Sequence, residues 1–262
     1  MKKRIFEFVL LLFCVSLFAV GCNLAEESPA GHTAVHWTYE GEEGPEHWGD
    51  LSEDYAACST GREQSPIDLT NAQGNDLQDI VFDYKPSAVK ILNNGHTVQV
   101  NYDAGSSIQV NGKSYQLVQF HFHVPSEHSV DGELSATEMH LVHKADDDSL
   151  AVVGVMINDG AENEAFAPVW DNLPAEESPE TTIDGATINA ADLLPDTFTY
   201  YTYPGSLTTP PCSEGVTWLV LTTPIEMSAE QIEAFEMIVE LNNRPVQSLN
   251  GRDLQEDTTT GN

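Results

Sequence analysis

The pattern of apolar and polar residues indicates short strands over most of the chain. Residues 96–102 alternate between polar and apolar side chains, as in a half-buried strand. Residues 107–110 and 115–120 lie on either side of Asn111-Gly112, a pair that favours a tight hairpin turn. Short segments rich in apolar or β-branched residues predict further strands at 137–143, 150–157 and 216–222.

Only one segment has a persuasive helical pattern. Ser228 can cap a helix, with Gln231 three residues later, and apolar residues follow at helical spacing at Ile232, Phe235, Ile238 and Val239. No linker or internal repeat interrupts the chain between its two ends. We therefore expect one β-dominated domain with a few short helices, spanning residues 35–253.

The first 21 residues have the pattern of an export signal. Lys2, Lys3 and Arg4 precede an apolar run over residues 8–20, which is too short and wrongly flanked for a good membrane span. The run ends in Ala19-Val20-Gly21-Cys22 and resembles a bacterial lipoprotein signal, although Ala19 stands where leucine is usual. We expect an exported protein, periplasmic or on the cell surface, with a lipid anchor at Cys22; ordinary secretory cleavage nearby is the alternative.

The residues flanking the domain are polar. Residues 22–34 predict a flexible tether, and residues 254–262 predict a disordered tail.

The charge of the chain is strongly acidic. Its 262 residues include 42 Asp and Glu against 10 Lys and Arg, a formal net charge of −32. Such a surface repels nucleic acid and anionic lipid, so we expect no nucleic-acid partner and membrane contact only through the anchor. We expect a solvated acidic surface without a partner role rather than a binding surface for a dedicated cationic partner. Adaptation to salty or alkaline surroundings is a further hypothesis.

The cysteines are consistent with export. Cys14 lies in the predicted signal and Cys22 is the lipidation candidate, which leaves Cys58 and Cys212 as an even pair. Closing so long a loop could stabilise the fold by roughly 5 kcal/mol. Zinc binding by the two thiolates is the weaker alternative, because no second cysteine lies near either one.

A metal site is the most informative feature of the sequence. In the run Gln119-Phe-His-Phe-His123, alternate strand residues share a face, so His121 and His123 point the same way. His140 supplies a third imidazole. Three neutral histidines leave a zinc ion with an open fourth position, the catalytic pattern, in which bound water ionises near neutral pH. Two exposed strand histidines without a metal are the alternative for the pair alone.

Two polar residues can support these ligands. Gln119 shares a face with His121, and Glu138 shares one with His140. Zinc-ligating histidines usually donate their second ring N–H to such groups. Glu138 could instead be a buried ion-pair partner.

Several runs together resemble the α-class carbonic anhydrases from about His36 to Arg252. They are His36-Trp37-x-Tyr39, Gly44-Pro-Glu-His-Trp-Gly49, Gln64-Ser-Pro-Ile67, Asn93-Asn-Gly-His96, Gln119-Phe-His-Phe-His123, Ser126-Glu-His128, Glu138-Met-His-Leu-Val-His143, Tyr203-Pro-Gly-Ser-Leu-Thr-Thr-Pro-Pro211 and Asn243-Arg-Pro245. Each run alone is modest, but all occur in one order. The resemblance implies a β-dominated α+β fold with a large twisted, mostly antiparallel central sheet.

The resemblance also implies reversible hydration of CO2 to bicarbonate by zinc-bound hydroxide, with Zn2+ on His121, His123 and His140. Thr208 would accept a hydrogen bond from the hydroxide while Glu127 takes the Thr208 proton, which orients the nucleophile. The positions that match the family's substrate pocket are Val142, Val152, Leu207, Thr208, Thr209 and Trp218; without the resemblance, the apolar ones are ordinary core residues.

Proton export would use His96, at the family's shuttle position, because histidine titrates near neutral pH. Tyr39, Asn94 and Gln99 match positions that order water between zinc and shuttle, with Gln99 longer than the usual asparagine. A surface histidine without a role is the alternative for His96. Cys58 and Cys212 match a disulfide of bacterial and extracellular members.

Two other functions compete with this hypothesis. A non-catalytic binding module on the same fold would usually have lost a zinc ligand, and none is lost here. A zinc esterase remains as a side activity, whereas no His-Glu-x-x-His run supports a protease. We expect a small-molecule substrate and a monomer or homodimer.

Overall fold

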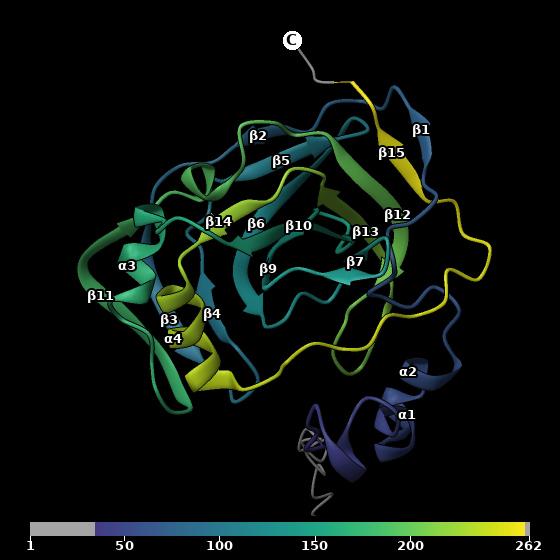
Figure 1. Cartoon of the computed structure of the whole chain (residues 1–262), viewed down its shortest axis with the longest axis horizontal. Coiled ribbons are helices and arrows are strands. Elements are labelled where there is room, and N and C mark those ends of the chain that lie inside the picture. Colours follow the sequence, from purple (N-terminus) through teal and green to yellow (C-terminus); the bar gives the residue numbers. More distant parts are fainter. Residues whose placement is uncertain (1–34, 260–262) are drawn as a thin grey trace, which may run out of the picture. The chain divides into compact units, whose positions relative to one another are not determined.

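Strands are the main secondary structure of the computed structural model, which describes residues 35–259 and has far fewer residues in helices (Figure 1). They are β1 (Gln73–Asn75), β2 (Val81–Asp83), β3 (Ser87–Asn93), β4 (Val98–Asn101), β5 (Ser107–Val110), β6 (Lys113–His123), β7 (Ser129–Val130), β8 (Glu133–Leu134), β9 (Thr137–Lys144), β10 (Leu150–Asp159), β11 (Ser178–Ile188), β12 (Tyr200–Ser206), β13 (Glu214–Leu221), β14 (Ile225–Met227) and β15 (Gln255–Asp257). The predicted signal and tether, including Cys22, lie outside the described residues.

The helices are short except for one. They are α1 (Trp48–Leu51), α2 (Ala57–Thr60), α3 (Ala167–Trp170) and α4 (Ala229–Val239), with 3-10 turns at Gly41–Glu43, Glu53–Tyr55, Glu164–Phe166 and Ala190–Leu193. Helix α4 begins after Ser228, whose hydroxyl accepts the Gln231 N–H while the Gln231 side chain accepts the Ser228 N–H. This capping box confirms the predicted start of the helix. No helix among residues 35–259 is long and apolar enough to span a membrane.

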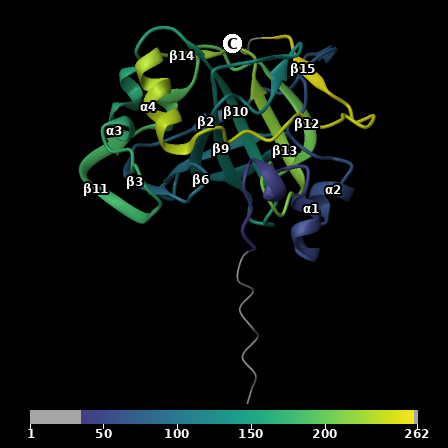
Figure 2. The same cartoon turned by 60° about the horizontal axis from the view of Figure 1, so that its bottom comes forward.

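One large mixed sheet organises the fold (Figures 1 and 2). Its strand order is β1-β15-β12-β13-β10-β9-β6-β4-β3-β11, with β14 beside β10 and β2 beside β5. Three pairings are parallel, β1 with β15 and β10 with both β13 and β14, and the other pairings are antiparallel. The predicted hairpin turn is also present, because Asn111 (φ 51°) and Gly112 (φ 74°) join β5 to β6. The predicted fold class is therefore confirmed.

Strand register brings distant parts of the sequence into one row. Gln99 lies opposite His121, His121 opposite His140, His140 opposite Gly154, and Gly154 opposite Val220. These five residues cross β4, β6, β9, β10 and β13 in order. Because opposed residues point to the same face of a sheet, the row collects the two histidines on one face.

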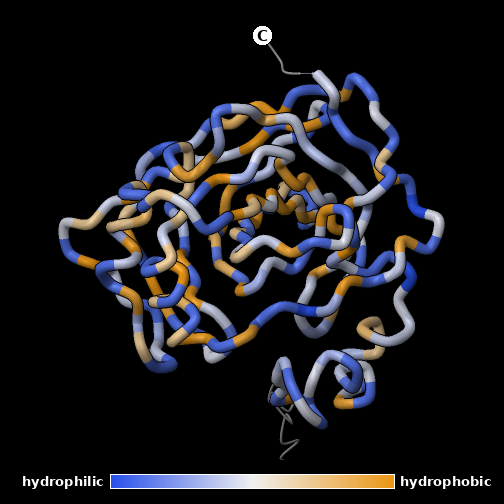
Figure 3. The backbone as a smooth tube through the Cα atoms, viewed as in Figure 1, coloured by the Kyte–Doolittle hydropathy of each residue, from blue (hydrophilic) through white to orange (hydrophobic). Residues whose placement is uncertain are grey.

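The two sheet faces bury different apolar clusters. Phe120 and Phe122 are fully buried, and Phe122 packs against Phe235 of α4 with ring centroids 5.7 Å apart. On the histidine face, Val152 and Trp218 belong to a smaller apolar cluster. Figure 3 shows the corresponding hydrophobic colouring in the central strands. The alternation within residues 119–123 therefore separates core from site, as the sequence predicts.

The C-terminal segment corrects the prediction of a disordered tail over residues 254–262. Strand β15 pairs in parallel with β1 and antiparallel with β12, and Leu254 and Asp257 are buried. The polar run Gln-Glu-Asp resembles solvated coil, but backbone hydrogen bonds to neighbouring strands do not require apolar side chains. Residues 260–262 lie outside the described part.

The two predicted partner cysteines form a disulfide. Cys58 of α2 joins Cys212 across 154 residues of sequence. Both sulfur atoms are used, so the alternative of zinc-ligating thiolates at these positions is excluded. The bond connects the N-terminal helical segment to the loop that follows β12.

Candidate metal and catalytic site

Three histidines converge on the site face of β6 and β9. His121 and His140 are paired across the strands, and His123 lies two residues beyond His121. One ligand nitrogen from each histidine lies within 4.8 Å of the other two. His123 and His140 are each 1% exposed, whereas His121 is partly exposed. The cluster thus has one open side.

Each histidine uses one ring nitrogen in a hydrogen bond and keeps the other free. His121 Nδ1 donates to Gln119 Oε1 at 2.8 Å, and His140 Nε2 donates to Glu138 Oε1 at 2.9 Å. His123 Nδ1 donates to the Asn242 carbonyl at 2.8 Å. These acceptors assign the proton and leave an unprotonated nitrogen on each ring for a metal.

The free nitrogen of His123 is the clearest sign of a metal site. His123 Nε2 is buried and has no hydrogen-bond partner among the described residues. A buried polar atom without a partner costs free energy, and a metal ion would remove that cost. Three imidazole nitrogens are the donor set of a catalytic zinc centre with an open position, so the residues fit the ion.

Local electrostatics keep His121 and His123 neutral. Burial lowers the pKa of both imidazoles and is the largest effect on each. Neighbouring histidines lower the pKa further, while the Glu127 carboxylate beside His123 acts in the opposite direction without outweighing burial. Burial would also lower the pKa of His140, but the Glu138 carboxylate outweighs it and raises that pKa. The difference follows from the acceptor, because only His140 donates to a charged group.

Glu138 is the centre of a buried hydrogen-bond chain. Its Oε1 accepts from His128 Nδ1 at 2.8 Å, and His128 Nε2 is 2.6 Å from the Tyr203 hydroxyl. Burial would raise the pKa of Glu138, yet His128 and His140 hold it well below its usual range. His128, Glu138 and His140 are close enough to resemble a second metal site. Their nitrogen and oxygen atoms are already hydrogen-bonded to one another. We therefore interpret this group as one that holds the His140 ring in orientation.

Glu127 faces the histidine cluster with one free oxygen. Its Oε1 accepts the Arg244 backbone N–H at 2.9 Å. Its Oε2 has no hydrogen-bond partner among the described residues and lies 3.5 Å from His123 Nε2 and 3.9 Å from His140 Nδ1. The structure shows no hydrogen bond between Glu127 and Thr208, so the predicted pairing of these two residues stays a prediction.

The four apolar residues predicted for the substrate pocket pack in one cluster on the histidine face. Val142 pairs with Val152, and Val152 with Trp218, across β9, β10 and β13. Trp218 lies edge to face with His140, with centroids 4.8 Å apart, and Leu207 packs on the same apolar cluster. Thr208 and Thr209 follow Leu207 in a loop that the Cys212 N–H closes onto the Thr209 carbonyl.

His96 lies apart from the three histidines. Its ring stacks on Trp37 at 3.6 Å with an interplanar angle of 9°, and both residues line a pocket of about 330 Å³ together with Tyr39. Burial and then His36 lower the pKa of His96, while Glu177 raises it. The stacking holds the imidazole at a partly exposed position, and its role as a proton shuttle stays a prediction.

The predicted water-ordering residues are partly occupied by protein contacts. Asn94 Oδ1 accepts the backbone N–H groups of His96 and Thr97, so it shapes the loop that carries His96. Gln99 Nε2 donates to Asn101 Oδ1, so the side-chain oxygen of Gln99 stays free. Gln99 lies opposite His121 on the neighbouring strand. Burial raises the pKa of Tyr39 well above its usual range, so its hydroxyl stays protonated.

Two supporting residues were missed by sequence reasoning. Asn242 holds His123 through its carbonyl, and its side chain contacts Val124 N and the Phe122 carbonyl. A Cβ at Gly154 would lie 2.9 Å from Glu138 Oε1, which is too close. Only glycine at this position leaves enough space for the Glu138 carboxylate. Neither position has a local signal, because their partners come from other strands.

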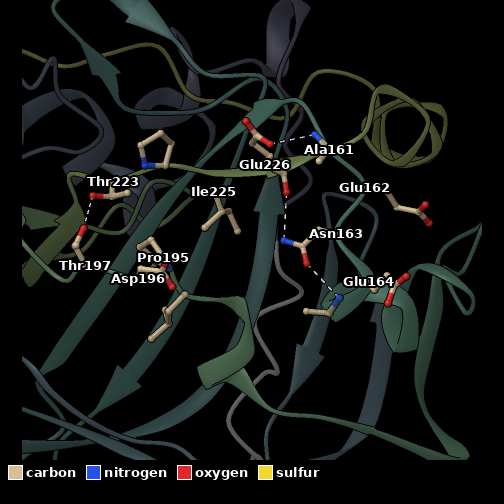
Figure 4. A pocket seen from close by; sticks show the side chains of 13 residues that line it. Ala161, Glu162, Asn163, Glu164, Pro195, Asp196, Thr197, Thr223, Ile225 and Glu226 are labelled. Atoms are coloured by element: carbon tan, nitrogen blue, oxygen red, sulfur yellow. Dashed lines mark hydrogen bonds between the residues drawn. The ribbon is translucent and has the colours of Figure 1, made fainter.

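A separate pocket of about 880 Å³ is lined by parts of residues 161–165, 194–197 and 223–226 (Figure 4). None of the three clustered histidines lines it. Its polar groups hold the loops together: Glu226 accepts the Ala161 N–H, and Asn163 donates to the Glu226 carbonyl. We find no catalytic arrangement there.

Comparisons with known proteins agree with the geometry. Residues 43–258 match the model of the eukaryotic-type carbonic anhydrase family. A carbonic anhydrase of Nostoc sp. is 45% identical over 249 residues, covering 93% of this chain and 94% of the relative.

Solved structures are similar as well. The α-carbonic anhydrase of Thermovibrio ammonificans, in complex with the inhibitor sulfanilamide, has a TM-score of 0.82 at 44% identity and covers 84% of this chain and 99% of its own. Dioscorin complexed with ascorbate has a TM-score of 0.79 at 29% identity, covering 86% of this chain and 100% of its own. The family match, the relatives named carbonic anhydrase and the histidine geometry agree, and the chain belongs to the family of eukaryotic-type, or α-class, carbonic anhydrases.

Proposed function

We propose that this chain catalyses the family's general reaction, the reversible hydration of CO2, as a zinc-dependent carbonate dehydratase. His121 Nε2, His123 Nε2 and His140 Nδ1 would hold the ion. The observation that carries the proposal is the hydrogen bonding of the three imidazole rings. In each ring, one nitrogen donates to an acceptor and the other nitrogen stays free for a metal. When bound, zinc lowers the pKa of a water molecule to about 7, a value known from carbonic anhydrases themselves.

Glu127 and Thr208 would orient the attacking oxygen. The unpartnered Glu127 Oε2 is a free acceptor beside the ligands, and the Thr208 hydroxyl could donate a hydrogen bond to it. Thr208 can then only accept a hydrogen bond from the attacking oxygen, which aims a lone pair at the substrate. Such orientation lowers the barrier without adding charge to the site.

The apolar wall suits a small uncharged substrate. Val142, Val152, Leu207 and Trp218 offer CO2 a surface with few competing hydrogen bonds, and Thr209 adds a polar edge beside Thr208. Bicarbonate, which is charged, gains less from this surface and is released. The same nucleophile would attack activated esters as a side reaction.

His96 would export the proton of each turnover through water ordered by Tyr39, Asn94 and Gln99. Its stacking on Trp37 and its place on a pocket wall support this role. We expect His96→Ala to slow turnover in weak buffer, with partial rescue by imidazole. Unchanged turnover in weak buffer would remove the shuttle role.

Metal analysis and stopped-flow CO2 hydration test the main proposal together. Purified wild-type protein should retain zinc and hydrate CO2 well above the buffer rate. His140→Ala should lose both, whereas His47→Ala, which removes an exposed histidine outside the cluster, should lose neither. Zinc-loaded wild type with a rate equal to buffer alone would exclude the enzyme and favour a binding module.

We also propose export and lipid anchoring at Cys22, which lies outside the described residues. The basic start, apolar run and terminal cysteine of residues 1–22 support it. Cys22→Ser should release the protein from membranes in cell fractionation. Equal fractionation of variant and wild type would leave ordinary secretory cleavage as the explanation.

A further inference from the structure

Arg244 is a buried cation behind the proposed catalytic residues. The residue lies five positions after the end of α4, and only 1% of it is exposed. Among residues 35–259, no carboxylate lies within ion-pair distance of its guanidinium. Burying a charge without an adjacent counter-charge is costly. The Arg244 guanidinium therefore needs hydrogen-bond acceptors around it.

The guanidinium meets three acceptors from one N-terminal segment. Nη1 donates to Gln64 Oε1 at 2.9 Å and to the Ser65 carbonyl at 2.8 Å. Nη2 donates to the Cys58 carbonyl at 3.0 Å, and the group lies 5.6 Å from the Trp48 ring centroid. Arginine is suited to this place because its planar fork reaches several acceptors at once.

The backbone of the same residue contacts the proposed catalytic machinery. Arg244 N–H donates to Glu127 Oε1 at 2.9 Å, while Glu127 Oε2 faces His123. The two oxygens of a carboxylate form one rigid group, so the atom that fixes Oε1 also aims Oε2. A shift of the residue-244 backbone would therefore turn the free oxygen away from the site.

We propose that Arg244 is a positioning residue: its guanidinium anchors the backbone at residue 244, and the N–H of that backbone holds Glu127 in orientation. This inference rests on the proposed function, in which Glu127 accepts a hydrogen bond from the Thr208 hydroxyl. Charge supports the geometry. Burial lowers the pKa of Arg244 to about 10, and the Glu127 carboxylate acts in the opposite direction, so the guanidinium stays cationic at neutral pH.

A double-mutant cycle tests whether Arg244 acts through Glu127. Arg244→Lys keeps the charge but loses the fork, and should lower kcat for CO2 hydration about 10- to 100-fold. KM should change little, because the apolar pocket is not touched. In a Glu127→Gln background the same change should have no further effect on kcat. Equal fold-changes in the two backgrounds would overturn the proposal.

Arg252→Lys is the matched control. This second, partly buried arginine also donates to backbone carbonyls, those of Gln64 and Pro204 among them, and lies over the Tyr203 ring. None of its hydrogen bonds is to Glu127. We expect Arg252→Lys to lower stability and to have the same effect on kcat in both backgrounds.

Nuclear magnetic resonance gives a readout that does not depend on turnover. In wild type, the residue-244 amide proton should be shifted downfield and protected from exchange by its carboxylate acceptor. Both properties should decrease in Arg244→Lys, measured on folded protein with and without zinc. An unchanged amide would overturn the proposal. A wild type without hydration activity would contradict the proposed function, while this measurement still decides whether Arg244 holds Glu127.

Discussion

At the scale of single residues, the chemistry of the site follows from what each side chain can donate or accept. Each of the three histidines has its own hydrogen-bond acceptor, which determines the ring nitrogen that is left for a metal. The acceptors are Gln119 for His121, Glu138 for His140 and the Asn242 carbonyl for His123. The first two lie in the same strands as their histidines, so period-two alternation predicts them. Asn242 is 119 residues from His123, and no local pattern could have found it.

His143 shows how environment changes a residue of the same type. It lies three residues beyond His140 but is fully buried, and its Nε2 is 2.8 Å from the Tyr84 hydroxyl. Burial lowers its pKa from the usual 6.5 to about 3. It therefore remains neutral where an exposed histidine would be charged.

This shift predicts a loss of stability in acid. Above pH 6.5, His143 is neutral in both the folded and the unfolded chain. Below 6.5 the unfolded chain binds a proton that the folded protein excludes until about pH 3, so the free energy of unfolding falls as pH falls through that window. The slope from this residue is about 1.4 kcal/mol per pH unit.

Urea unfolding between pH 7 and pH 4 measures the effect. The variant His143→Leu should lose less stability than wild type over this range, because it has no proton to exclude at that position. Other titrating groups contribute equally to both proteins and cancel in the difference. Parallel curves would contradict the pKa shift.

At the scale of elements, register decides which residues meet. Gly154 of β10 lies opposite His140 of β9, and a Cβ there would approach Glu138 Oε1 to 2.9 Å and Val220 to 3.3 Å. Strands β9 and β10 are predictable from their apolar pattern. Their pairing register is not, because several offsets would bury similar apolar surface.

Gly154→Ala should weaken metal binding. The added methyl group would displace the Glu138 carboxylate and disturb the hydrogen bond to His140, which should reduce zinc affinity about 10-fold. Competition with a chromogenic chelator measures the affinity. Val155→Ala, a neighbouring change on the other face of β10, should lower stability with unchanged zinc affinity. If the two variants bind zinc equally well, Gly154 has no role in placing Glu138.

At the scale of the whole molecule, the disulfide joins two segments that the sheet alone does not pair. Cys58 and Cys212 are 154 residues apart, so their bond removes much conformational freedom from the unfolded chain. The double variant Cys58→Ala with Cys212→Ala should be less stable by about 5 kcal/mol in the chain-entropy model. Chemical unfolding measures this loss.

The reduced wild type is a control for this prediction. Reductant should lower the stability of wild type toward that of the double variant and leave the variant unchanged. A double variant as stable as the oxidised wild type would contradict this prediction.

Net charge also acts on the whole molecule. With 42 acidic and 10 basic residues, like charges repel one another in the compact state. Sodium chloride screens this repulsion, so the free energy of unfolding should rise between low salt and about 0.5 M. Chloride is preferable to sulfate, which stabilises proteins by exclusion from their surface. A steady fall of stability with added chloride would contradict adaptation to salt.

The sequence by itself determined the family, the main strands, the capped helix and the three histidines. Each of these depends on local alternation, on local capping or on motifs whose residues are close in sequence. Only the tertiary structure decided the row from Gln99 to Val220, the need for Gly154 and the contact between Arg244 and Glu127. The same holds for β15, where a polar run became a strand. These features depend on contacts between segments far apart in sequence, and a local pattern of side chains does not specify which distant segments meet.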